Sequence, residues 1–146
     1  MAQTNWTGPL VSGDRPAGFP GGPNVGFVVL SQTLTLTADG TTVQNGTFRL
    51  PRGSQIIDFK VDCRTAFNGT TPVLSAGITS GGTQYLIDIA MGTTGRKALG
   101  LTAPQLEALQ TIGGNREVVV TITGGTASAN GVAYVEIQYV QKTADD

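Results

Sequence analysis

Carboxylates on one predicted strand are the residues of this chain best suited to chemistry. Asp58 and Asp62 alternate with Lys60 and Arg64 in the segment SQIIDFKVDCRTAF. Two carboxyl groups can serve as the acid and base of an inverting glycosidase when they lie about 6.5–9.5 Å apart. Four residues along a strand span roughly 13 Å, which is too far. The alternating charges instead predict a solvated stripe used for cross-strand ion pairing or edge protection.

Other reactive residues are few and scattered. The sequence contains no His, which excludes Ser-His-Asp and Cys-His catalysis and imidazole ligation of a metal. Cys63 is the only Cys and alternates onto an apolar face, so we expect a buried, inert thiol. Asp88 is expected on the wet face of its strand, and Arg96 and Lys97 on solvated surface. We therefore predict no catalytic residue, no cofactor and no metal site.

Aromatic residues, whose rings can stack on a sugar, are also scarce and make up 6% of the sequence. Tyr85 and Tyr139 lie on strand faces that we expect to point into the core. Tyr134 and Trp6 are then left as possible sugar platforms, so a carbohydrate-binding, adhesin-like module stays open as an alternative.

Composition indicates one folded and nearly neutral β protein. A chain of 146 residues with 39% hydrophobic residues is long enough to bury one proper core. Nine basic and ten acidic residues give a net charge of -1, with no basic run, so we expect no nucleic-acid partner. Neither a signal peptide nor an apolar stretch of ~18 residues is present. We accordingly expect that the protein is made in a cytoplasm and does not associate with a membrane.

Apolar residues alternate with polar ones from about residue 27 onward, which predicts seven to nine β-strands at sandwich-like spacing. Asn45-Gly46 and Asn68-Gly69 are typical of turns, and the segment around Asn45 is either one bulged strand or a hairpin. The residues expected on the core faces are Phe48 and Leu50; Ile57, Phe59, Val61 and Cys63; Leu74, Ala76 and Ile78; Tyr85, Ile87, Ile89 and Met91; Val118, Val120 and Ile122; and Ala133, Val135, Ile137 and Tyr139.

One short helix interrupts the strands. Thr102 is a suitable N-cap with Gln105 three residues later, and Gly113 is a suitable stop. The residues expected to face the sheet are Leu106, Leu109 and Ile112. Residues 26–146 are therefore predicted to form an all-β domain, a jelly-roll-like antiparallel β-sandwich with one short helix.

Residues 1–25 differ from the rest of the chain and are predicted to form an extended N-terminal arm. Pro and Gly are frequent there, and neither helical nor strand periodicity is present. Large apolar side chains would have no use in a purely flexible linker. The arm either folds back over its own domain or reaches a neighbouring subunit. As partner-binding residues in the second case we predict Trp6, Leu10, Val11 and Phe19.

Residues 50–86 resemble small virion structural proteins of tailed bacteriophages. The resemblance is carried by three motifs, which are Leu50-Pro51-Arg52-Gly53, Thr65-Ala66-Phe67-Asn68-Gly69 and Pro72-Val73-Leu74-Ser75-Ala76-Gly77. It implies a non-enzymatic protein that decorates the exterior of a capsid as a β-sandwich trimer. The implied partners are the major capsid protein and further copies of this chain. A tail, fibre or connector component of the virion is the other role that the resemblance leaves open.

Overall fold

The computed structural model describes residues 28–110, 112, 114 and 117–141. The predicted arm, with Trp6, Leu10, Val11 and Phe19, lies outside the described residues, as does Gly113. Eight strands and one helix follow in the order β1 (Val29–Thr37), β2 (Val43–Arg49), β3 (Gln55–Thr65), β4 (Val73–Gly77), β5 (Leu86–Ala90), β6 (Gly95–Arg96), α1 (Ala103–Ala108), β7 (Glu117–Thr123) and β8 (Val132–Val140). The predicted all-β class is confirmed.

The strands form two antiparallel four-stranded sheets, in the orders β1-β8-β3-β6 and β2-β7-β4-β5. The first strand pairs with the last, the second with the seventh, the third with the sixth and the fourth with the fifth. The chain is thus a long antiparallel ribbon rolled up on itself, which is the jelly-roll arrangement. The prediction of a jelly-roll-like sandwich is correct.

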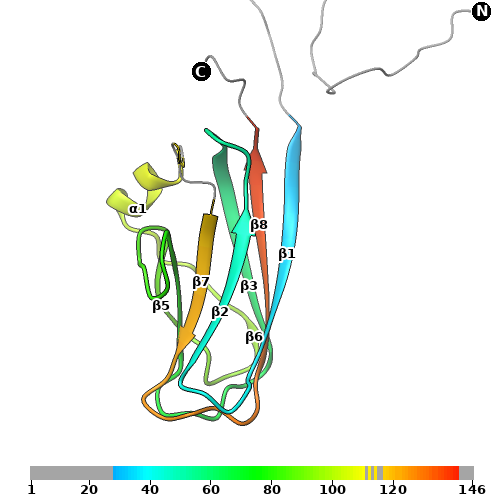
Figure 1. Ribbon diagram of the computed structural model, residues 1–146, viewed down its shortest axis with the longest axis vertical. Helices are drawn as coiled ribbons and strands as arrows, with labels where there is room; N and C mark the ends of the chain where they lie inside the picture. The colour runs from blue at the N-terminus through cyan, green and yellow to red at the C-terminus, as the bar shows by residue number, and fades with distance from the viewer. Residues whose placement is uncertain (1–27, 111, 113, 115–116, 142–146) are drawn as a thin grey trace, which may run out of the picture.

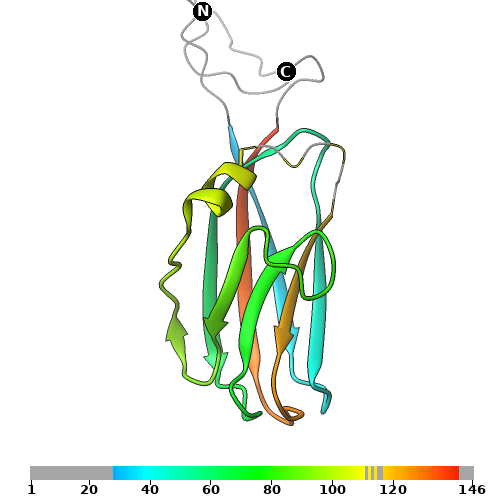
Figure 2. The ribbon, with the colours of Figure 1, turned by 90° about the vertical axis from the view of Figure 1, so that its left-hand side faces the viewer.

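The two sheets lie face to face, with the sheet of β2, β7, β4 and β5 in front of the other in Figure 2. β1 begins and β8 ends at the same end of the sandwich, the upper end in Figure 1, and α1 lies at that end as well. The connections β1–β2, β3–β4 and β7–β8 gather at the opposite end.

The core lies between the sheets and is built by period-two alternation. Val120 of β7 and Val61, Val135 and Ile137 of the facing sheet are completely buried, and so is Leu74 of β4. Each such side chain contributes about 1.5–3 kcal/mol by leaving water. The core faces predicted for β7 and β8 are confirmed throughout, and Phe48 and Leu50 are buried as predicted.

A β-bulge overturns the prediction for Ile57. Ile56 pairs with Tyr139 and Asp58 with Gln138, which leaves Ile57 as an extra residue with no partner on β8. Ile56 therefore takes the core position at 2% exposure, and Ile57 is turned outward at 45%. Beyond the bulge the predicted alternation resumes.

The predictions for Ile87 and Ile78 are also wrong. A register shift separates the β4–β5 pairs between Leu74 and Ala76, and Asp88 within β5 has a positive φ of 50°. Leu86 is consequently buried while Ile87 is 44% exposed, and Asp88 is exposed as predicted. Ile78 is 41% exposed because β4 ends at Gly77, one residue before it.

Asn45 and Gly46 do not form a turn. They lie inside the continuous strand β2, where Asn45 pairs with Thr121 and Gly46 with Val120. A Cβ atom on Gly46 would stand 3.0 Å from Leu36 Cδ2 of β1. The side chains of Leu34 and Leu36 in β1 thus pack directly on the backbone of β2, in the room that Gly46 leaves.

The helix starts as predicted and ends early. Gln105 Oε1 accepts a hydrogen bond from the backbone N–H of Thr102 at 2.8 Å, which forms half of a capping box. α1 ends at Ala108 because the following chain pairs with the start of β3, where Ile56 N donates to Leu109 O at 2.8 Å. Leu109 and Ile112 are buried as predicted.

Leu106 does not face the sheet and is 52% exposed. The inward position of this short helix belongs to Gln105, which is 6% exposed and whose side chain is occupied by capping. Successive helical residues point about 100° apart, so Leu106 is turned away.

The second resemblance motif closes the lower end of the sandwich. Phe67 is buried, and Asn68 Oδ1 accepts hydrogen bonds from the backbone N–H groups of Ala129 and Asn130 at 2.9 and 3.1 Å. Gly69 N donates to the hydroxyl of Ser128 at 2.9 Å. Asn68 and Gly69 thus lie in the loop between β3 and β4, as predicted for a turn, and fasten it to the loop before β8.

The first motif forms a tight turn, and the third contains a close contact between two backbone segments. Pro51 O accepts hydrogen bonds from the N–H and the hydroxyl of Ser54 in a tight turn, at 3.2 and 2.6 Å, and Gly53 adopts a φ of +72° there. Gly77 leaves no room for a Cβ, which would stand 2.6 Å from the backbone of Gly82. The motif residues therefore maintain the fold.

Replacing Gly131 by Ala should destabilise the protein by about 1–3 kcal/mol, as overpacking does. Its Cβ would lie 2.5 Å from the ring of the buried Phe67, and its φ is +155°. The free energy of unfolding from urea titration measures the effect. Gly100→Ala is the matched control, because nothing lies within 4 Å of its Cβ position. Equal stability of the two variants would contradict this packing.

Candidate functional site

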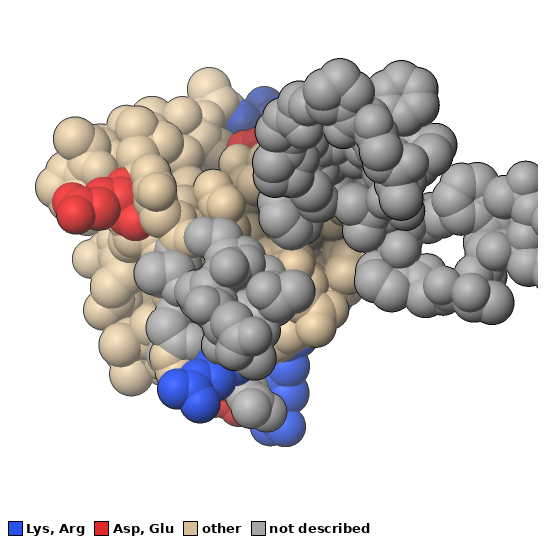
Figure 3. All heavy atoms as spheres, turned by 90° about the horizontal axis from the view of Figure 1, so that it is seen from above, with Lys and Arg blue, Asp and Glu red and all other residues tan. Residues whose placement is uncertain are grey.

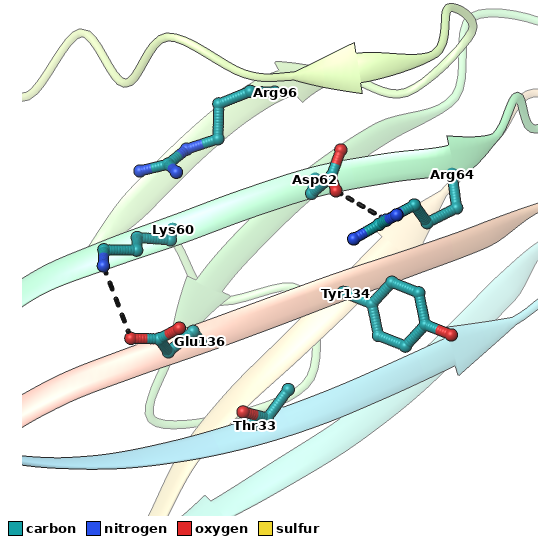
Figure 4. A pocket seen from close by; sticks show the side chains of 7 residues that line it. All are labelled: Thr33, Lys60, Asp62, Arg64, Arg96, Tyr134 and Glu136. Carbon is teal, nitrogen blue, oxygen red and sulfur yellow. Dashed lines mark ion pairs between the residues drawn. The ribbon is translucent and has the colours of Figure 1, made fainter.

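A hollow of about 430 Å³ opens on the outer face of the β1-β8-β3-β6 sheet. Every one of its residues points away from the core, and Figure 4 shows how their side chains converge from four neighbouring strands. The residues that line it are Thr33 of β1, Tyr134 and Glu136 of β8, Lys60, Asp62 and Arg64 of β3, and Arg96 of β6.

Strand register brings these residues together. Glu136 is directly opposite Lys60 on one side and Thr33 on the other. In the next outward-facing row, Asp62 is opposite Tyr134 on β8 and Arg96 on β6. Residues far apart in the chain thus share one surface: Arg96 and Asp62 are 34 positions apart, and Tyr134 and Lys60 are 74 apart.

Two exposed ion pairs cross this surface. Lys60 Nζ lies 3.6 Å from Glu136 Oε1, and Arg64 Nε lies 2.6 Å from Asp62 Oδ2 (Figure 4). The first joins two strands, as the charge alternation predicts, whereas the second stays within β3. Such pairs contribute only up to about 1 kcal/mol each. Asp62 is held by a cation, and the separation of Asp58 and Asp62 along one strand gives no acid–base pair.

Tyr134 is exposed as predicted, at 39%. The guanidinium carbon of Arg64 lies 5.2 Å from the centre of its ring, in a cation–π contact. One face of the ring is therefore occupied. Tyr85 and Tyr139 are buried in the core, as predicted.

Arg96 also lines the hollow, and nothing in the sequence indicates this position. The sequence predicts only that it is solvated, and it is indeed exposed. It belongs to β6, a strand of two residues that is too short to show any periodicity. In the ranges that the structure describes, no ion pair involves Arg96.

Cys63 lies on the opposite face of β3, in the core. It is 1% exposed, and its thiol faces the backbone oxygens of Thr65 and Met91 at 3.3 and 3.5 Å. Burial raises the pKa of this thiol above its ordinary value. The prediction of a buried thiol is confirmed.

The described ranges hold neither a cluster of metal ligands nor a helix that could span a membrane. No group of three or more His, Cys, Asp or Glu residues there is arranged to hold a metal ion. The described part of the chain also contains no helix long and apolar enough to cross a membrane.

Charged side chains also lie on the end of the molecule that carries α1. Figure 3 views this end and shows them at separate places among uncharged residues. The hollow itself combines charged side chains, an aromatic ring and a concave shape.

Comparison with known proteins gives a structural likeness and no sequence family. No protein-family model and no curated protein matches the chain. Among solved structures it is similar to a chain of the "Cyanophage Pam1 capsid asymmetric unit", with a TM-score of 0.57. The likeness covers 90% of this chain and 96% of that chain at 23% sequence identity. The two chains therefore share a fold over almost their whole lengths.

The raised pKa of Cys63 makes a testable prediction about stability. Above the ordinary pKa of 9.0 the thiol loses its proton in the unfolded chain but keeps it in the folded protein. The free energy of unfolding therefore falls as the pH rises through this range. Urea titrations between pH 8 and pH 10.5 should show a steeper loss of stability for the wild type than for Cys63→Ala. Tyr85, whose pKa burial also raises, contributes equally to both proteins. Parallel curves would contradict the prediction.

Proposed function

We propose that this protein is a non-enzymatic structural protein of a tailed-bacteriophage virion. Its role is that of a capsid decoration, or cement, protein. It binds the exterior of the assembled shell as a homotrimer and stabilises it by bridging neighbouring coat subunits. The protein is made in the host cytoplasm and ends in the virion.

The observation that carries the proposal is the jelly-roll fold shared with a chain of a phage capsid asymmetric unit. The likeness spans 96% of that chain, so the two proteins match as whole units and not through a common fragment. The three motifs of residues 50–77 add independent support, since they resemble virion proteins and each maintains a turn or close contact of this fold. Jelly rolls serve in many viral capsids.

The charges of the hollow support a binding role over catalysis. Asp62 and Glu136 are each held by a cation, and the chain contains no His to act as a base near neutral pH. A sugar-binding role is less favoured, because Arg64 covers one face of Tyr134, the aromatic ring of the hollow.

We further propose a division of the chain into an arm, residues 1–25, and a sandwich domain, residues 26–146. The arm contacts a coat subunit or a sister copy through Trp6, Leu10, Val11 and Phe19. β1 starts at Val29, at the end of the sandwich, so an arm that precedes it can extend away from the domain (Figure 1). Many weak contacts of this kind, repeated over a shell, give strong overall binding.

Binding to particles tests the function directly. The purified protein should sediment with assembled shells that lack it and should remain in solution with free coat subunits, because a bridging site exists only after assembly. Cosedimentation followed by quantitative mass spectrometry measures the bound copies per particle. A copy number matching a tail or connector position, or binding to free coat subunits, would contradict decoration.

Deletion of residues 1–25 tests the arm. The shortened protein should fold, with the far-ultraviolet circular dichroism of a β-sandwich, and should bind shells at least about tenfold more weakly. A full-length variant with Trp6, Leu10, Val11 and Phe19 changed to Ser keeps the chain length as a control and should show the same loss. Unchanged shell binding by both variants would exclude the arm as the contact.

A further inference from the structure

The hollow on the outer face of the β1-β8-β3-β6 sheet carries an uncompensated positive charge. Three cations, Lys60, Arg64 and Arg96, meet two carboxylates, Asp62 and Glu136. Glu136 pairs with Lys60 and Asp62 pairs with Arg64, so these five side chains keep a net charge of +1. Within the described residues the guanidinium of Arg96 then has no ionic partner, although it borders a concave surface.

The position of Arg96 suits an incoming carboxylate. It lies opposite Asp62 in the register of β3 and β6, yet the carboxylate of Asp62 is turned to Arg64, with 2.6 Å between Nε and Oδ2. Figure 4 shows the Arg96 side chain over the same surface as Lys60 and Asp62. A free guanidinium binds a planar carboxylate through two parallel hydrogen bonds. Lys60 and Arg64 add to the attraction at short range.

The remaining lining favours a peptide over a sugar. An acidic sugar would be expected to stack on Tyr134, but Arg64 lies over one face of that ring at 5.2 Å. The hydroxyl of Thr33 adds a neutral polar group to the lining. Glu136 Oε1 also accepts a hydrogen bond from the carboxamide of Gln138 at 2.9 Å. The hollow, about 430 Å³, is open and large enough for one or two side chains.

We propose that this hollow binds an acidic segment of a protein partner, with an Asp or Glu carboxylate of that partner on Arg96. Because the identification of the partner as a coat subunit rests on the proposed function, the site itself is tested with a defined peptide. A protein that attaches to an assembled shell through its arm alone would be free to rotate. A second contact through the hollow would fix its orientation.

The probe is hexaglutamate, titrated into the full-length isotope-labelled protein at low salt. Two-dimensional NMR should show shifts of the Arg96 Nε–H signal and of backbone amides in 60–64, 95–97 and 133–136. The shifts should weaken as salt rises, since exposed charges are screened. Hexaglutamine should produce none. Absence of shifts at the hollow with millimolar hexaglutamate would overturn the proposal.

Arg96→Gln should weaken hexaglutamate binding by about tenfold, as loss of charge-assisted hydrogen bonds does. Arg52→Gln is the matched control, because Arg52 is an exposed cation on a turn and is not part of the hollow. Equal weakening by both substitutions would reduce the effect to net charge and overturn the site. Tighter binding of hexagalacturonate than of hexaglutamate at the same signals would overturn the choice of a peptide.

Shell cosedimentation separates this inference from the proposed function. If Arg96→Gln loses hexaglutamate but binds shells as the wild type does, the hollow is not the shell contact, and the inference falls while the function stands. If the wild type binds hexaglutamate at the hollow but binds no shells, the peptide site stands and the function falls. Parallel loss of both activities in Arg96→Gln, with Arg52→Gln unaffected, supports both.

Discussion

The structure depends on the two-residue period of β8, the strand that lies between β1 and β3. Its inward residues, Val135 and Ile137 among them, are completely buried and fill the core between the sheets. Its outward residues Tyr134 and Glu136 line the hollow, where each faces a charged residue of β3. A slip of one residue would place Glu136 in the core and Val135 and Ile137 on the surface. The pairing that buries the core therefore also assembles the candidate site.

Much of the fold could be predicted from the sequence, because a strand that is buried on one side alternates apolar and polar residues. Every residue predicted for the core faces of β7 and β8 is buried, and the Thr102–Gln105 capping box marks the start of α1. Two of the errors occur where a partner strand sets the register. Ile57 and Ile87 look like core residues in the alternation, but each lies at an irregularity of pairing that only the neighbouring strand defines.

The hollow could be predicted only in part. The alternating charges of 58–64 and the exposure of Tyr134 are readable in the sequence, whereas the meeting of Lys60 with Glu136 depends on residues 76 positions apart. Arg96 lies on β6, a strand of two residues that is too short to show a sequence pattern. The motifs that resemble virion proteins form turns and close contacts of the fold, such as the Pro51–Ser54 turn. They carry the fold and not the chemistry.

The proposed cement role requires a rigid body, a defined orientation and contacts to more than one subunit. The jelly roll supplies the first, and the proposed hollow and arm supply the others. Cryo-electron microscopy of the virion tests this account most directly. If the proposal is correct, density for the sandwich lies in three-fold clusters on the outside of the shell. Each arm then contacts a neighbouring subunit, and the Arg96 face contacts an acidic coat segment. Density confined to the tail or to the interior of the shell would contradict it.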